Sequence, residues 1–79
     1  MTESVDRKLQ IAVVALAGEL DYGRAAKRLR ISPSELNRQI STLEDQLTLR
    51  IFRANGRTVE LTEAGQVFVR ACRRFLAIR

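Results

Sequence analysis

Apolar residues recur at helical spacing on both sides of a short break near position 31. Before the break, the stretch from Ala25 to Leu29 is typical of a short helix, and after it the sequence signals the start of a second one. Ser32 can cap this second helix and Pro33 fits its first position. Glu35 stands three residues after the cap, where its carboxylate can reach back to the N–H of the cap. This order predicts a helix-turn-helix.

The second helix is predicted to have an apolar back and a polar front. The back contains residues at steps of four, three and four, namely Leu36, Ile40, Leu43 and Leu47. The front carries Ser34, Asn37, Arg38 and Ser41. Side chains of this reach suit the major groove of B-DNA, which admits a helix and presents acceptor atoms to donors. A polar front is also typical of a solvated surface helix, so this helix alone leaves both interpretations open.

Two helices are expected before the break. The first runs from about Val5 to Gly18 and has two apolar stripes, which predicts burial between two neighbours. One stripe contains Val5, Leu9, Ala12, Val13 and Leu16, and the other contains Ile11, Val14 and Ala15. The next helix is expected from Tyr22 to Arg30, with Asp21 as its cap and the pair Ala25-Ala26 as the small surface that lets the following helix cross closely.

A hairpin is predicted after the second helix of the motif. Two short β-prone runs surround Asn55-Gly56, which is a strong signal for a two-residue turn. A turn at these residues pairs Phe52 with Val59 on one face and Arg53 with Thr58 on the other. A hairpin in this place is the wing of a winged helix.

Basic and polar residues of these elements are the candidates for contacts with the DNA backbone. Arg53 and Arg57 lie on the wing, where they can reach phosphates or the minor groove, although a loop arginine is by default solvated. Arg24, Ser32 and Ser41 complete the predicted backbone set. A helix-turn-helix followed by a basic hairpin favours DNA binding more strongly than either part alone.

The last segment, Thr62 to Arg79, is expected to be a helix capped by Thr62. One apolar face contains Ala64, Val67, Phe68, Ala71, Phe75 and Ile78 and can pack on the first helix. A second face contains Val69, Cys72 and Leu76, and no further element of the chain remains to cover it. We therefore expect a homodimer through Val69, Cys72 and Leu76 around a two-fold axis. The alternative is that these three are scattered surface residues, which are common.

Charge and composition point toward an anionic partner. The chain has 79 residues, enough for one domain, and its 14 Lys and Arg against 9 Asp and Glu give a net charge of +5. Most of the basic residues are arginines, which make forked contacts to phosphate or guanine. A soluble basic domain without an anionic partner has the same composition, so charge alone does not separate the two.

Several kinds of chemistry are excluded. With no histidine and a single cysteine, the chain cannot assemble a protein-bound zinc site, a Ser-His triad or a Cys-His nucleophile. Glu44 and Asp45 are adjacent on a helix and are expected to diverge as surface charges. We expect no enzyme activity and no cofactor. The chain has neither a long apolar run nor a signal peptide, so we expect a cytoplasmic protein that does not enter a membrane.

A set of spaced motifs adds a family resemblance. The motifs are Ala25-Ala26 with Leu29, Ser32, Arg38-Gln39-Ile40, Leu43-Glu44 with Leu47, Leu49-Arg50-Ile51-Phe52, and Leu61-Thr62-Glu63-Ala64-Gly65. From Leu9 to about Gln66 the chain resembles the N-terminal winged helix-turn-helix domain of LysR-type bacterial transcriptional regulators. The resemblance implies that Pro33, Ser34, Asn37 and Arg38 face base edges or adjacent phosphates. It also implies that the wing touches the DNA backbone and that the helix from Thr62 is the linker helix through which this family dimerises.

The chain departs from the family pattern at four places. Asn37 stands where the family usually has a serine, Glu35 where it has a small residue, and Thr48 where a glycine commonly ends the recognition helix. The usual wing pair of an acidic residue and an arginine is here Arg53-Ala54. Asn37 can read adenine or bind a phosphate, and Glu35 can serve the cap alone, so base preference stays open.

We therefore predict a mainly α fold with two parts. Residues 1–61 form a winged helix-turn-helix, with a three-helix core and a short β-hairpin wing, and residues 62–79 form a long linker and dimerisation helix. The predicted function is sequence-specific binding of double-stranded DNA by a LysR-type regulator. The effector domain of that family has no counterpart here, so we expect a fragment or a truncated regulator that binds no small-molecule effector. Two alternatives stay open: the DNA-binding half of a molybdate-responsive type regulator, and a winged helix that binds proteins only.

Overall fold

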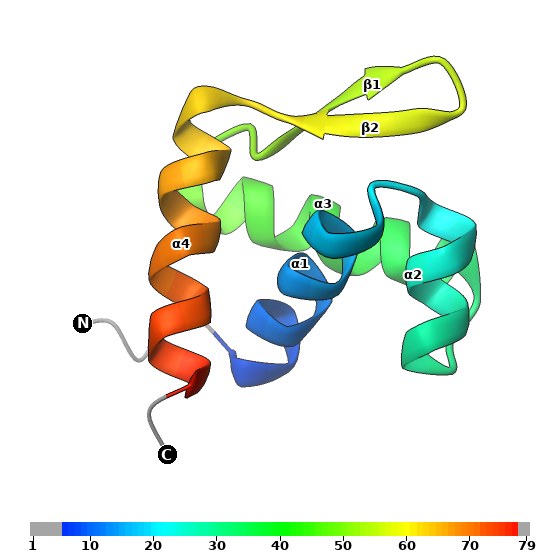
Figure 1. Ribbon diagram of the computed structural model, residues 1–79, viewed down its shortest axis with the longest axis horizontal. Coiled ribbons are helices and arrows are strands. Elements are labelled where there is room, and N and C mark those ends of the chain that lie inside the picture. The colour runs from blue at the N-terminus through cyan, green and yellow to red at the C-terminus, as the bar shows by residue number, and fades with distance from the viewer. Residues whose placement is uncertain (1–5, 78–79) are drawn as a thin grey trace.

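The computed structural model describes residues 6–77, which fold into four helices and one two-stranded antiparallel sheet. The elements are α1 (Arg7–Glu19), α2 (Tyr22–Leu29), α3 (Pro33–Leu47), β1 (Phe52–Asn55), β2 (Thr58–Leu61) and α4 (Glu63–Ala77). Helices α1, α2 and α3 pack together, the hairpin lies along one side of them, and α4 runs from the base of the hairpin beside α1 (Figure 1). This is the predicted winged helix-turn-helix followed by a further helix.

The three-helix core forms because each helix turns one apolar stripe inward. The largest fully buried side chains are Val13, Leu16, Leu36, Ile40, Leu43, Ile51 and Val69. Ala25 and Ala26 are buried in the same cluster, and their small size lets α2 pack closely against its neighbours, as predicted. The second stripe predicted for α1 is only partly covered, because Ala15 is buried, Val14 is half-buried and Ile11 is 40% exposed.

Side-chain caps fix where the helices begin. Asp6 precedes α1 and accepts a hydrogen bond from the backbone N–H of Lys8, while the predicted start at Val5 lies outside the described residues. Asp21 accepts from the N–H of Arg24 at 2.9 Å, and Ser32 accepts from the N–H of Glu35 at 3.0 Å. Both predicted caps of the helix-turn-helix are therefore confirmed.

The hairpin forms where predicted, but in a different register. Phe52 pairs with Leu61 and Asn55 pairs with Thr58, so the two turn residues are Gly56 and Arg57. Gly56 has a φ of 66°, and Arg57 is not among the residues with positive φ. This pattern is typical of a type II′ turn, which places glycine first, whereas the predicted Asn-Gly turn needs positive φ at both positions. The predicted pairing of Phe52 with Val59 is wrong by two residues, a shift that keeps the faces unchanged.

Helix α4 buries the second of its two predicted apolar faces more deeply than the first, which was predicted to pack on α1. Val69 and Cys72 are only 2% and 5% exposed, and Leu76, on the same side, is half-buried. Gly65 determines this orientation, because a Cβ there would overlap the backbone carbonyl oxygen of Ile51. The steps from Gly65 to Val69, Cys72 and Leu76 are four, three and four, so close approach at Gly65 buries all of them.

Two of the three residues predicted for the dimer interface are therefore not available to a partner. Val69 and Cys72 belong to the core of the chain itself, where α4 packs against α1, whereas Leu76 is only half-buried. The apolar face left outside contains Val67, Ala71 and Phe75, which are exposed, and Ala64 and Phe68, which are half-buried. We call these five residues the outer face of α4. Ile78, predicted to share that face, lies outside the described residues.

Candidate nucleic-acid interface

The exposed face of α3 carries the predicted base-reading residues. All four are exposed, on the side of α3 that faces away from buried Leu36, Ile40 and Leu43. They are Pro33, Ser34, Asn37 and Arg38. The predicted backbone contact Ser41 is exposed on the same side. The period of the helix thus brings five predicted contacts onto one surface, backed by a rigid core.

A hollow of about 320 Å³ separates this face of α3 from the wing. Its lining includes Asn37 and Ser41 from α3, Arg53 from β1, and two residues that we did not predict, Tyr22 and Arg50. The structure therefore joins predicted base and backbone contacts in one concave surface. Arg50 was missed because it belongs to no predicted element, although its charge between the helix and the wing was the available signal.

Tyr22 also lines this hollow. Burial raises the pKa of Tyr22, and the negative charge of Glu44 raises it further. The phenol therefore stays protonated at neutral pH and can donate a hydrogen bond to a phosphate oxygen. No sequence signal marked Tyr22, because it is simply the first residue of α2.

Glu44 connects α3 to the wing. Its carboxylate accepts hydrogen bonds from the backbone N–H groups of Ile51, at 2.8 Å, and Phe52, at 3.1 Å. The expectation that Glu44 is a diverging surface charge is wrong, since it satisfies two backbone donors where the chain enters β1. This contact fixes the position of the wing relative to the recognition helix.

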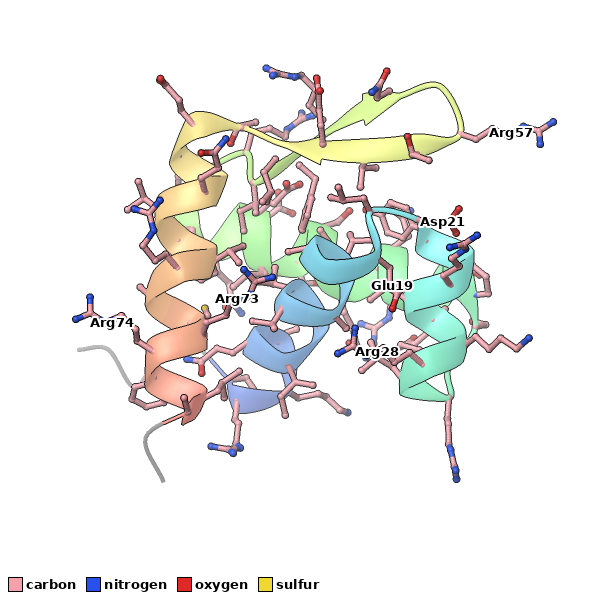
Figure 2. The ribbon with its side chains drawn as sticks, viewed as in Figure 1. Glu19, Asp21, Arg28, Arg57, Arg73 and Arg74 are labelled. Atoms are coloured by element: carbon pink, nitrogen blue, oxygen red, sulfur yellow. The ribbon has the colours of Figure 1, made fainter. Side chains whose placement is uncertain are left out.

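The two wing arginines are placed differently. Arg53 donates to Glu60 at 2.9 Å, across the strand pair, so its charge is partly compensated. Arg57 occupies the turn, and Figure 2 shows its side chain extending from the tip away from the helices. Of the other predicted backbone contacts, Arg24 is exposed in the first turn of α2, and Ser32 is exposed although its hydroxyl caps α3.

Glu35 does not complete a reciprocal cap. Its carboxylate instead accepts two hydrogen bonds from Arg38, at 3.0 and 2.6 Å, and one from the Gln39 amide at 2.9 Å. These bonds, above all those from Arg38, lower the pKa of Glu35 to about 2, and the carboxylate in turn raises the pKa of Arg38. Arg38, one of the predicted base-reading residues, is thus held by Glu35, which lies one helical turn earlier.

Residues 6–77 contain no cluster of side chains suited to hold a metal ion. Within the same range, no helix is long and apolar enough to cross a membrane.

Comparison with known proteins assigns the chain to a family. Residues 8–66 match the model described as bacterial regulatory helix-turn-helix protein, lysR family. The chain belongs to the lysR family. It is 40% identical over 60 residues to the HTH-type transcriptional regulator AlsR of Bacillus subtilis, covering 76% of this chain and 20% of that protein. It is 42% identical over 71 residues to the regulator XapR of Escherichia coli, covering 90% and 24%.

Solved structures of LysR-type domains have the same fold. The crystal structure of the CbnR_DBD-DNA complex superposes with a TM-score of 0.87 at 32% identity, covering 91% of this chain and 83% of that one. The BenM_DBD/benA site 1 DNA complex gives a TM-score of 0.88 at 27% identity, covering 92% and 82%. The chain therefore has the winged helix-turn-helix fold of LysR-type DNA-binding domains, and the family match favours the predicted function over both alternatives. It spans about a quarter or less of the length of the curated relatives named above.

Proposed function

We propose that this domain binds double-stranded DNA with α3 in the major groove, where Ser34, Asn37 and Arg38 contact base edges. The observation that carries the proposal is the single exposed face on which these donors lie, opposite the buried back of the helix. Arg38 can bind guanine and Asn37 can bind adenine, each through two hydrogen bonds. Pro33 starts the helix and brings its first turn toward the bases.

The hollow beside α3 and the tip of the wing supply the contacts to the DNA backbone. Arg50, Arg53 and Tyr22 line the hollow, and Arg57 extends from the tip of the wing (Figure 2). Positive charge and hydroxyl donors of this kind bind phosphates without regard to sequence. Two similar structures that are DNA complexes, at 27% and 32% identity, support this arrangement. A regulator that acts on DNA works in the cytoplasm of a bacterium and needs no catalytic residue.

We further propose that the domain forms a homodimer through the outer face of α4. Val67 and Phe75 are 64% and 60% exposed on one face of the helix, with exposed Ala71 between them, and contiguous apolar patches mark interaction surfaces. An identical face around a two-fold axis covers both at once. Such a dimer presents two recognition helices to successive major grooves.

Substitution of Arg38 tests the base contacts. Arg38→Ala removes the guanidinium but leaves the fold intact, because the side chain is exposed. We expect a loss of about 1–3 kcal/mol on a duplex selected from a random pool and a relaxed preference at one base pair. Arg70→Ala, an equal loss of charge on exposed α4, is the matched control. Equal effects of the two substitutions on affinity and site preference would remove Arg38 from the recognition surface.

A salt titration tests whether DNA is the partner at all. The affinity of a domain that neutralises several phosphates falls steeply as salt rises. A winged helix that binds only proteins shows no affinity for duplex DNA at low salt, and that result would overturn the proposed function.

A further inference from the structure

Glu35 stands where the resemblance leads us to expect a small residue, and the role proposed for it below rests on the proposed function of α3. Its carboxylate is forked onto Arg38, with Nε of the guanidinium 3.0 Å from Oε1 and Nη2 2.6 Å from Oε2. Arg38 lies on the surface proposed to face the bases, with its side chain 67% exposed, and Glu35 lies beside it with its side chain 35% exposed. A negative charge therefore sits at the edge of the proposed DNA-binding surface.

A buried amide fixes the carboxylate from the other side. The Nε2 atom of Gln39 donates to Oε2 of Glu35 at 2.9 Å, and Gln39 is only 6% exposed. Lys8 of α1 also favours the ionised form of Glu35. The acidic side chain is thus anchored to the core through Gln39, and Arg38 is anchored to it. An exposed arginine without such a support loses more rotamer entropy when it becomes fixed on a base.

The fork leaves one edge of the guanidinium available. Of the five N–H groups of an arginine, the carboxylate takes one on Nε and one on Nη2. Of the remaining three, one on Nη1 and one on Nη2 point along the edge formed by these two nitrogens, and the third points toward the Cδ side. This edge suits the O6 and N7 acceptors of guanine, whereas a phosphate approaching Arg38 meets the negative charge of Glu35.

We propose that Glu35 is a specificity-determining positioning residue, which holds Arg38 with one edge free for guanine and keeps the guanidinium off phosphates. It raises the ratio of specific to random DNA affinity rather than the affinity itself. Its charge weakens binding to every duplex, while the fixed orientation of Arg38 recovers that loss only where a guanine is present.

The test compares Glu35→Gln with Asp45→Asn in the otherwise unchanged domain. Each variant removes one negative charge from α3, but Asp45 is exposed near the end of the helix and outside the fork. The probes are a duplex selected by the unmutated domain and a random duplex of equal length. We expect Glu35→Gln to strengthen random binding and to reduce the ratio of specific to random affinity roughly five- to tenfold, within the discrimination of one forked base contact. Asp45→Asn should change both affinities alike and keep the ratio. An unchanged ratio in Glu35→Gln overturns the proposal.

A measurement without DNA separates this proposal from the proposed function. In the free domain, NMR titration of the Glu35 carboxyl should give a pKa of about 2, and Arg38→Ala should return it toward the ordinary value of 4.5. An ordinary pKa in the unmutated domain overturns the role of Glu35, even if the domain binds DNA specifically. A low pKa in a domain that prefers no selected duplex overturns the proposed function instead, and with it the role of Glu35 in specificity.

Discussion

At the scale of single residues, the two wing arginines differ in what they must give up to bind a phosphate. Arg53 already donates to Glu60, so a phosphate has to replace an existing ion pair. Arg57 extends from the turn beyond the strands (Figure 2). A phosphate can bind there without breaking the ion pair between Arg53 and Glu60. An exposed ion pair contributes little to stability, but it reduces the charge that DNA meets. Arg57 should therefore contribute more to binding than Arg53.

Arg57→Ala should weaken selected and random duplexes alike, because a phosphate contact carries no base information. The slope of log affinity against log salt should decrease in magnitude by about one unit for the lost contact. Titrations at four or more salt concentrations measure this, with Arg53→Ala as the comparison, for which we expect the smaller change. A variant with an altered base preference and the same slope would contradict a phosphate role for Arg57.

The sequence predicted which donors of α3 are exposed, but it did not predict which side chains form hydrogen bonds with other residues of the chain. Ser34, Asn37 and Arg38 follow from helical period alone, since three buried leucine and isoleucine positions fix which side faces out. Glu44 and Tyr22 escaped prediction because their surroundings come from another element: the N–H groups that Glu44 accepts lie seven and eight residues away. The ion pair between Glu35 and Arg38 joins residues that are close in sequence, but so does the reciprocal cap. The sequence alone did not show which of these two contacts the carboxylate makes.

At the scale of elements, the end of α3 contains local strain. Thr48 ends the helix with a φ of 52° and a ψ of 49°, in the left-handed region. A β-branched residue is rarely found there, because its Cβ crowds the following carbonyl. The family resemblance places a glycine at this position. Glycine adopts the left-handed conformation seen here without strain.

Thr48→Gly should therefore stabilise the domain. Relief of the left-handed conformation is worth roughly 1–2 kcal/mol, and the added freedom of glycine in the unfolded chain opposes it by about 0.5–1 kcal/mol, leaving a gain of about 0.5–1 kcal/mol. Urea unfolding measures this as a higher midpoint with an unchanged slope. Gln46→Gly, in the last helical turn, is the control and should lose up to about 1 kcal/mol. A lower midpoint for Thr48→Gly would show that the threonine side chain stabilises the helix end.

The existence of each element was predictable, and its precise pairing was not. The wing was found from two β-prone runs, but its register depends on whether Asn55 or Gly56 takes the first turn position. The backbone N–H of Val59 also donates to the carbonyl of Leu20 at 3.1 Å, a contact between the wing and the end of α1 that local turn rules do not include. Tertiary contacts of this kind select one register among those the turn residues allow.

At the scale of the whole molecule, α4 has two apolar faces. One is buried in the core through Val69 and Cys72, and the other contacts the core through half-buried Phe68. The sequence showed both faces but not which one is buried more deeply, because that choice depends on a single close approach between Gly65 and the chain at Ile51. Thr62 strengthens the same junction: its hydroxyl donates to the carbonyl of Arg50 at 2.6 Å and accepts from the N–H of Gly65 at 2.9 Å. The junction leaves the outer face of α4, with Val67 and Phe75, pointing into solvent.

We expect Phe75→Glu to give a folded monomer. Phe75 is 60% exposed, so the change removes no core contact, but it places a charge in the proposed dimer interface. The variant should sediment as a monomer where the unmutated domain is a dimer. Its affinity for a single half-site should stay the same, and its affinity for an inverted repeat with half-sites roughly 34 Å apart should fall about a hundredfold, since the two domains no longer bind as one unit.

Gln66→Glu separates the interface from a mere change of charge. It alters net charge by the same amount as Phe75→Glu, on the same helix, at an exposed position away from the outer face. This control should remain dimeric and bind the inverted repeat nearly as well as the unmutated domain. If Phe75→Glu stayed dimeric, the outer face of α4 would not be the interface. If the unmutated domain were monomeric at high micromolar concentration, its binding to an inverted repeat would require some other contact between the two copies.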